Sequence, residues 1–204
     1  MSPIYSIGHS NHDINTFIKL LKLHGISALA DVRSHPYSRF VPQYSREALK
    51  ASLAEAQIAY VFLGKELGVR SDDPACYIEG KVQYDRLAKQ PIFSAGIHRI
   101  IKGMNRYRIA LMCAEKDPID CHRALLVARN LVDSDISVDH IHADGALESH
   151  GHLESRLLAM YKLPERDMFS ARSEIIADAY FIQEQRVAYY DEAMGQEEKK
   201  QTTA

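Results

Sequence analysis

The sequence has no uninterrupted apolar stretch near the ~18 residues that a membrane-spanning helix needs. It has only three cysteines, Cys76, Cys113 and Cys121, too few and too odd in number for a disulfide framework. The first residues lack a basic segment followed by an apolar one, so we expect no secretory signal. These absences predict a protein of the reducing cytoplasm that does not associate with membranes.

The chain also has little net charge, because 25 Lys and Arg oppose 27 Asp and Glu and leave −2. A near-neutral chain argues against bulk electrostatic binding of nucleic acid, but it leaves room for a local basic patch. With 46 % hydrophobic and 25 % charged residues, disorder of the whole chain is excluded. The 204 residues suit one domain, expected over 3–192, with a flexible tail over 195–204.

Apolar runs alternate along the chain with segments of helical periodicity. We predict strands over residues 3–7, 26–32, 58–63, 107–113 and 137–142. We predict helices over residues 13–24, 45–56, 82–89, 91–103 and 117–132, a long loop over 64–80, and C-terminal helices within 148–192. This order predicts an α/β fold with an open, mainly parallel, Rossmann-like sheet of about five strands and helices on both faces.

In such a sheet, ligands bind beyond the carboxyl ends of the strands. Four polar clusters of this sequence follow predicted strands: 8–12, 31–36, 113–115 together with 121–123, and 142–145. Turn or cap chemistry explains any one cluster alone. Four clusters at one predicted edge favour a shared site.

The triplet Cys121-His122-Arg123 carries the most chemical content. We expect Asp117 to cap a helix with Pro118 in its first position, which places the triplet near the positive end of the helix dipole. Exposed amides and Arg123 would suit a phosphate or carboxylate, and a thiol there tends toward the thiolate. The alternative is that Cys121 is a small buried apolar residue and His122 an exposed one.

Four residues are candidates for catalysis. Asp31 ends an apolar strand, and because burying an unpaired carboxylate is costly, it is either a catalytic acid or the partner that positions Arg33. Cys113 is a second candidate nucleophile, with Glu115 as general acid or base, unless it is a core cysteine. His9 is expected to transfer protons near neutral pH.

Basic and aromatic residues alternate between 32 and 46, where no acidic residue occurs, and residues 91–114 carry only basic charges. Such a segment can track a phosphate chain and stack on bases, although a solvated surface explains either segment alone. The expected substrate-binding residues are Ser10, Asn11, Arg33, Ser34, Arg39, Cys121, His122, Arg123 and Asp144.

No cofactor is predicted, but zinc is an alternative. Its ligands would be two cysteines, one histidine of the triplet and one further histidine: Cys113, Cys121, His122 and one of His9, His12 or His142. The Cys-x7-Cys spacing matches no compact zinc finger or ribbon, in which pairs are usually two to four residues apart.

These clusters, in this order, resemble a bacterial family catalogued as domain of unknown function 488. The resemblance rests on residues 6–11, 31–42, 113–115 with 121–123, and 140–145, and covers about residues 3–158. It implies a compact α/β fold and no particular reaction. The segment 31–33 is also similar to rhodanese-like domains, but their active-site loop has no counterpart here.

The sequence therefore favours an enzyme, a hydrolase or transferase, that binds an anionic, phosphate-bearing substrate such as a nucleotide or nucleic acid at the carboxyl edge of the sheet. Two alternatives remain. One is a non-catalytic nucleic-acid-binding or adaptor module that uses residues 33–46, and the other is a structural zinc site.

Overall fold

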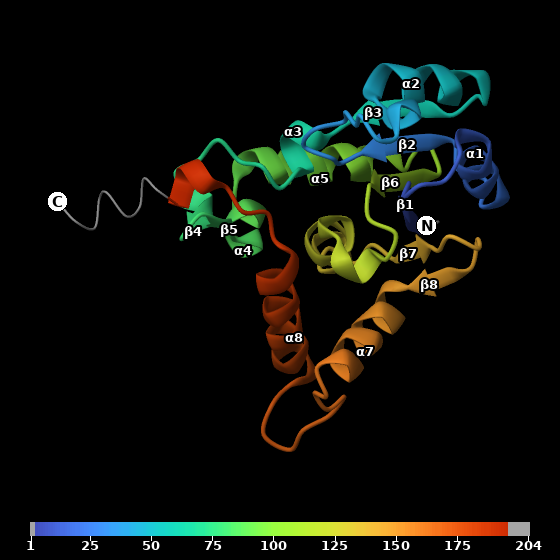
Figure 1. The fold of residues 1–204 in the computed structure, drawn as a ribbon. Coiled ribbons are helices and arrows are strands. Elements are labelled where there is room, and N and C mark those ends of the chain that lie inside the picture. Colours follow the sequence, from blue (N-terminus) through green and yellow to red (C-terminus); the bar gives the residue numbers. More distant parts are fainter. Residues whose placement is uncertain (1–2, 196–204) are drawn as a thin grey trace.

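The computed structural model describes residues 3–195 and contains a six-stranded sheet in the order β3-β2-β6-β1-β7-β8 (Figure 1). The strands of the sheet are β1 (Ile4–Gly8), β2 (Ala28–Asp31), β3 (Ala59–Phe62), β6 (Ile109–Cys113), β7 (Val138–Ile141) and β8 (Leu147–Ser149). The first five are parallel and β8 is antiparallel to β7. The predicted α/β class and the mainly parallel sheet are confirmed.

The helices follow the predicted alternation closely. They are α1 (Ile14–Leu23), α2 (Arg46–Glu55), α3 (Gly64–Leu67), α4 (Tyr84–Ala88), α5 (Pro91–Gly103), α6 (Arg129–Val132), α7 (His150–Met160) and α8 (Arg172–Val187). Helix α1 illustrates how local residues set the ends of a helix. Asp13 caps its start by accepting from the Thr16 N–H, and Gly25 ends it in the left-handed region, at a φ of 64°.

The two faces of the sheet are covered by different helices, because side chains alternate between faces along each strand. In β6, Ala110 and Met112 pack with residues of α1 and α2. Ile109, Leu111 and Cys113 pack on the opposite face, against α5, α7 and α8 and the helix that begins after Cys121. The last residue of β6 therefore points its thiol to this second face.

Two predicted elements are wrong. The loop expected over 64–80 contains α3, the 3-10 turn η2 (Pro74–Cys76) and β4 (Tyr77–Ile78), which forms a small hairpin with β5 (Lys81–Val82) just beyond it. These pieces are too short to show a periodicity in the sequence.

The helix expected over 117–132 is broken at Cys121. Asp117 caps only the 3-10 turn η3 (Pro118–Asp120), and Cys121 is extended, with φ −137° and ψ 138°. The next helix begins with the π-helical segment η4 (Arg123–Ala128) and continues as α6. The turn η1 (Pro42–Tyr44) precedes α2 in a similar way.

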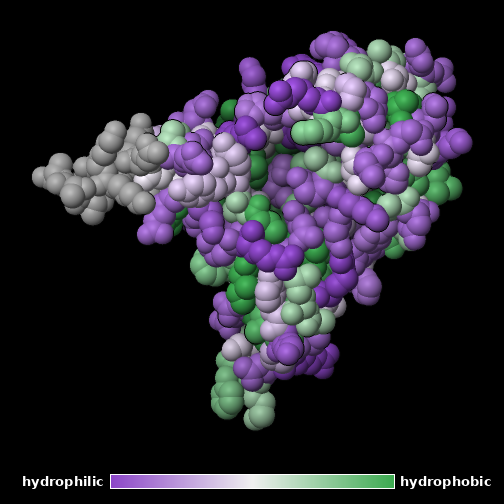
Figure 2. All heavy atoms as spheres, viewed as in Figure 1, coloured by the Kyte–Doolittle hydropathy of each residue, from purple (hydrophilic) through white to green (hydrophobic). Residues whose placement is uncertain are grey.

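Helices α7 and α8 pack on each other and extend away from the sheet, with their connection at the lower end of the molecule (Figure 1). Hydrophobic residues are visible at that end in Figure 2, and Met168 and Phe169 in this connection are 91 % exposed. Helix α7 begins two residues later than predicted, because residues 147–149 form β8. None of the helices within residues 3–195 is long and apolar enough to cross a membrane. Most of the tail predicted over 195–204 lies outside the described residues.

Gly8 offers a direct test of the packing at the carboxyl end of β1. A Cβ on Gly8 would lie 1.8 Å from the Glu115 carbonyl oxygen, whereas one on Gly151 in α7 would meet nothing within 4 Å. We expect Gly8→Ala to lower the free energy of unfolding by at least about 3 kcal/mol. Gly151→Ala should raise it by up to about 1 kcal/mol, because alanine is the better helix former. Urea unfolding of both variants measures this, and equal stabilities would contradict the close approach.

Candidate functional site

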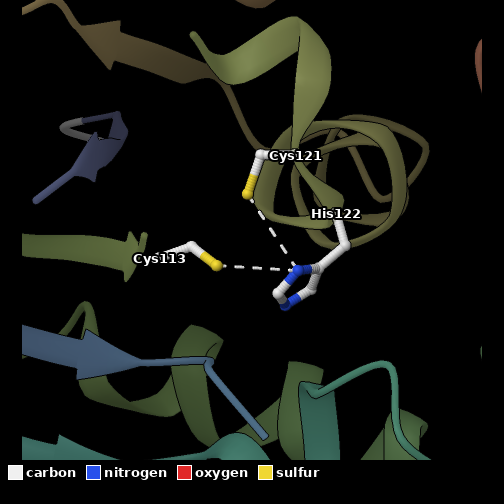
Figure 3. A group of neighbouring side chains, drawn as sticks. All are labelled: Cys113, Cys121 and His122. Carbon is white, nitrogen blue, oxygen red and sulfur yellow. Dashed lines mark hydrogen bonds between the residues drawn. The ribbon is translucent and has the colours of Figure 1, made fainter. Parts of the chain in front are cut away.

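The connection between β6 and η4 brings three reactive side chains to one point. Cys113 ends β6, Cys121 is the extended residue before the helix, and His122 begins that helix. Their ligand-type atoms all lie within 4.8 Å of one another, and all three residues are buried. Figure 3 shows the two sulfur atoms directed at the same imidazole nitrogen.

His122 is oriented by a backbone contact. Its Nε2 lies 3.0 Å from the carbonyl oxygen of Val32, so this nitrogen carries the proton and donates it. In the neutral ring, Nδ1 then has a free lone pair, and it lies 3.7 Å from Cys113 Sγ and 4.0 Å from Cys121 Sγ. The β2 strand end therefore fixes which nitrogen meets the two thiols.

Cys121 occupies the cap position of the helix. Its carbonyl accepts from Ala124 and Leu125, and its Sγ lies 3.5 Å from the Arg123 amide N–H. Burial disfavours a thiolate, but the hydrogen bond from Cys113, the charge of Arg123 and the contact with His122 hold the pKa of Cys121 well below its ordinary value. The hydrogen bond with Cys121, together with burial, raises the pKa of Cys113 well above its ordinary value. Of the two thiols, Cys121 is therefore the more acidic.

Glu115 lies beside this pair. A hydrogen bond of 2.9 Å joins its Oε2 to Cys121 Sγ. Burial, and then the neighbouring Cys121, raise the pKa of Glu115 above its ordinary value. For His122, burial opposes protonation, but the hydrogen bond and charge of Cys121 outweigh it and raise the pKa. The Glu115 carboxyl and the His122 imidazole thus both contact the Cys121 sulfur, and His122 also contacts the Cys113 sulfur.

Arg123 holds the connection between β6 and η4 through hydrogen bonds to its backbone. Its side chain is fully buried, and its Nη1 and Nη2 donate to the carbonyl oxygens of Glu115 and Lys116 at 2.7 and 3.2 Å. Among the side-chain nitrogen and oxygen atoms that are buried within residues 3–195, only Arg123 Nε lacks a hydrogen-bond partner. The expected role of Arg123 as a direct anion ligand has no support in this placement, because the guanidinium is engaged by the backbone.

A second polar cluster lies at the end of β2, on the face covered by α1 and α2. Arg33 forms a bidentate ion pair with Asp31, with Nε–Oδ1 at 2.9 Å and Nη2–Oδ2 at 2.7 Å. Its remaining contacts are the Tyr44 carbonyl at 2.8 Å and His9 Nε2 at 3.2 Å, and Tyr60 donates to Asp31 at 2.8 Å. Asp31 is fully buried. Of the two uses open to Asp31, this geometry matches the one that positions Arg33.

His9 belongs to this second cluster. Its Nδ1–H donates to the Ser10 carbonyl, its Nε2 accepts from Arg33, and its ring stacks on Tyr44 at 4.2 Å. Burial, assisted by the charge of Arg33, lowers the pKa of His9 to about 4. A group with this pKa is neutral near pH 7, and the expected role of His9 in proton transfer stays a prediction.

A pocket of about 310 Å³ opens at the carboxyl edge of the sheet, where Cys113, Cys121 and His122 form part of its lining. The predicted site residues that line it are Arg33, Ser34, Cys113, Glu115, Cys121 and His122. The predicted residues outside its lining are His9, Ser10, Asn11, Asp31, Arg39, Arg123 and Asp144. Only part of the expected shared site therefore comes together, and the catalytic and binding roles stay predictions.

The outlying residues have local contacts instead. Ser10 and Asn11 hydrogen-bond to each other in the turn after β1, and Arg39 is exposed. Asp144 accepts from the Ala146 N–H in the β7–β8 turn. Cys76 is buried in the core, away from the other two cysteines.

Sequence reasoning missed Arg70, which lines the pocket. Its amide donates to Ser34 Oγ, its Nη1 lies 2.6 Å from His35 Nδ1, and its guanidinium stacks over Tyr189. No carboxylate forms an ion pair with Arg70 in the described part of the chain. The one available signal was that Arg70 lies in the long loop predicted over 64–80, because long loops inside compact domains are often functional.

Removing the charge of Asp31 tests the second cluster. Asp31→Asn leaves Arg33 buried without its counter-ion, so we expect the free energy of unfolding to fall by about 3–5 kcal/mol. Tyr60→Phe removes one hydrogen bond to the same carboxylate and should cost only about 1 kcal/mol. Urea unfolding at pH 7 measures both, and similar losses in the two variants would disprove the assignment.

The buried histidines predict a pH dependence of stability. The pKa of His9 and that of His150 are lowered to about 4, for both mainly by burial, whereas an unfolded histidine titrates near 6.5. The unfolded chain thus gains these protons first, and stability falls as the pH drops from 6.5 to 4, by about 3 kcal/mol for each residue. His9→Gln should flatten this dependence, and His98→Gln, at an exposed position, should not. Identical pH profiles for the two variants would contradict the assignment.

Comparison with known proteins identifies a family for the chain. The family model described as "Domain of unknown function DUF488" matches residues 13–130, which include the site at 113–123 but not β1. Neither the curated proteins nor the solved structures contain a significant match. The match spans more than half of the sequence, and the protein belongs to the DUF488 family.

Proposed function

We propose that the protein is a hydrolytic enzyme that acts on an anionic, phosphate-bearing substrate in the carboxyl-edge pocket. The observation that carries this proposal is the composition of the pocket, whose lining joins two thiols, the His122 imidazole and the Glu115 carboxyl with Arg70, an arginine that has no ion pair among the described residues. The second carboxylate of the lining, Asp120, is already paired with Arg186. Ligands of parallel α/β sheets bind at this edge. Ionisable groups with shifted pKa values in a pocket are typical of active sites.

Arg70 is the anchor that we assign to the anion. Arg33 also lines the pocket, but its guanidinium already donates to Asp31, Tyr44 and His9. Arg70 contacts His35 and makes no ion pair in the described residues. A planar guanidinium can donate two parallel hydrogen bonds to a phosphate. Ser34 and His35 lie beside it and offer a hydroxyl and an imidazole to the same anion.

Glu115 is the group that we assign to proton transfer. Its carboxyl lines the pocket and contacts the Cys121 sulfur, so it lies between the reactive floor and the space for the substrate. A carboxyl in this place can take a proton from an attacking water and return it to the leaving group. Asp31, buried beyond the pocket lining, is not assigned a chemical step.

A second candidate function is binding of single-stranded nucleic acid without catalysis. Tyr37 and Phe40, next to Arg39 in the loop after β2, are 72 % and 94 % exposed. Exposed aromatic rings next to a cation are platforms on which bases stack. This loop also carries Ser34 and His35 of the pocket, so a nucleic-acid substrate would unite the two candidates.

Arg70→Ala tests the proposed function, with Arg39→Ala as the matched control outside the pocket lining. Loss of a charge-assisted contact is worth about 1.5–3 kcal/mol, so we expect Arg70→Ala to weaken binding of inorganic pyrophosphate about 10- to 100-fold. Arg39→Ala should leave it unchanged. Isothermal titration calorimetry measures both, and hydrolysis of a panel of nucleotides should be lost in Glu115→Gln. Oligonucleotide binding that needs Phe40 but not Arg70, without any turnover, would replace the proposal by the second candidate.

A further inference from the structure

We propose that Cys113, Cys121 and His122 bind a zinc ion at the floor of the pocket. The inference rests on the proposed function for its consequence, since it names the group that acts on the substrate in that pocket. The ion-binding site itself is argued from geometry, ligand orientation and charge.

The distances from His122 Nδ1 to the two sulfurs are close to those that zinc requires. With Zn–S near 2.3 Å, Zn–N near 2.0–2.1 Å and tetrahedral angles, sulfur and nitrogen ligands lie ~3.6 Å apart. The distances from His122 Nδ1 to Cys113 Sγ and Cys121 Sγ are 3.7 and 4.0 Å. Small side-chain shifts would bring all three atoms to one ion.

The orientation of His122 is that of a metal ligand. Metal-bound histidines usually donate their second ring N–H to a carbonyl or carboxylate, which fixes the tautomer and the ring direction. His122 Nε2 makes this bond to the Val32 carbonyl, and its Nδ1 faces the two sulfurs (Figure 3). The lone pair and both thiols thus converge on one point between β6 and the start of the helix.

The charges of the site also suit a divalent cation. Zinc with two thiolates is neutral, which leaves one negative carboxylate on Glu115 and one positive guanidinium on Arg123. Arg123 is fully buried and has only backbone carbonyls as partners within the described residues. Because buried unpaired charge is costly, a bound dication between two thiolates allows the whole group to be ionised and balanced.

Three protein ligands leave the fourth position open to the pocket, which is typical of catalytic rather than structural zinc. Among the described residues, none of the histidines expected to complete a structural site (His9, His12 or His142) belongs to this group of donor atoms. His9 contacts Arg33 and His142 contacts Glu148 instead. A water in the open position would give one proton to Glu115, and its oxygen would form a bond to phosphorus. The bond from phosphorus to the leaving oxygen then breaks, and that oxygen takes the proton from Glu115.

The test is uptake of Co²⁺ and Zn²⁺ by the full chain. Protein purified without a histidine tag, stripped with a chelator and reduced, should take up one zinc per chain by elemental analysis. Co²⁺ should give the intense visible absorption of a tetrahedral cysteine-ligated site. Cys113→Ser and Cys121→Ser should each lose this absorption, whereas Cys76→Ala, the matched control outside the cluster, should keep it.

Wild-type protein provides a readout that does not depend on the folding of variants. Because all three cysteines are buried, the readout is a difference: zinc should slow the labelling of Cys113 and Cys121 by iodoacetamide relative to metal-free protein, as mass spectrometry of the labelled peptides measures, and should leave the labelling of Cys76 unchanged. No uptake of either metal by the reduced protein, or uptake without protection of these two cysteines, overturns the inference. If metal is not bound but Arg70→Ala still abolishes pyrophosphate binding, only the zinc site fails. If zinc is bound but Arg70→Ala leaves the affinity for pyrophosphate unchanged, the proposed function fails and the zinc site stands.

Discussion

One buried guanidinium holds the connection on which the candidate site depends. Arg123, at the start of η4, donates to the carbonyl oxygens of Glu115 and Lys116. These two hydrogen bonds hold the chain that follows β6 against the first turn of this helix. Gly8 allows this arrangement, because any side chain there would occupy the space of the Glu115 carbonyl and approach Arg123. Cys113, Glu115, Cys121 and His122 are all carried by this short connection or its ends. Their convergence is therefore a consequence of one buried cation and one glycine.

The parallel sheet divides the polar residues of the carboxyl edge into two groups with different tasks. On the face of α1 and α2, Asp31, Arg33, His9 and Tyr60 satisfy one another and leave few free donors. On the other face, the thiols, His122 and Glu115 line a pocket and contact one another. Breaking a closed, buried ion pair destabilises a fold, whereas ionisable groups that line a pocket can take part in chemistry. The division explains why residues that are adjacent in the sequence pattern do not form a single site.

The sequence was sufficient to predict the succession of strands and helices along the chain, the parallel sheet and the edge at which polar residues gather. These features follow from turn residues and helical periodicity, which are local signals. It could not tell that Asp31 and Cys113 face opposite sides. Both end strands that are apolar on both faces, so the alternation that would assign a side is missing. Arg70 was missed for a related reason: its position depends on Ser34 and on Tyr189 near the C-terminal end, contacts that no local pattern encodes. The break at Cys121 is likewise imposed by the partners of its thiol and of Arg123.

In the proposed zinc site, the two cysteines and His122 form one ligand set in the lining of the pocket. X-ray absorption spectroscopy at the zinc edge measures this set directly in the metal-loaded protein. The account predicts two sulfur neighbours at about 2.3 Å and one imidazole nitrogen at about 2.0–2.1 Å, with a light oxygen neighbour in the open position. A shell of oxygen and nitrogen neighbours without sulfur, or one with four sulfurs, would contradict it.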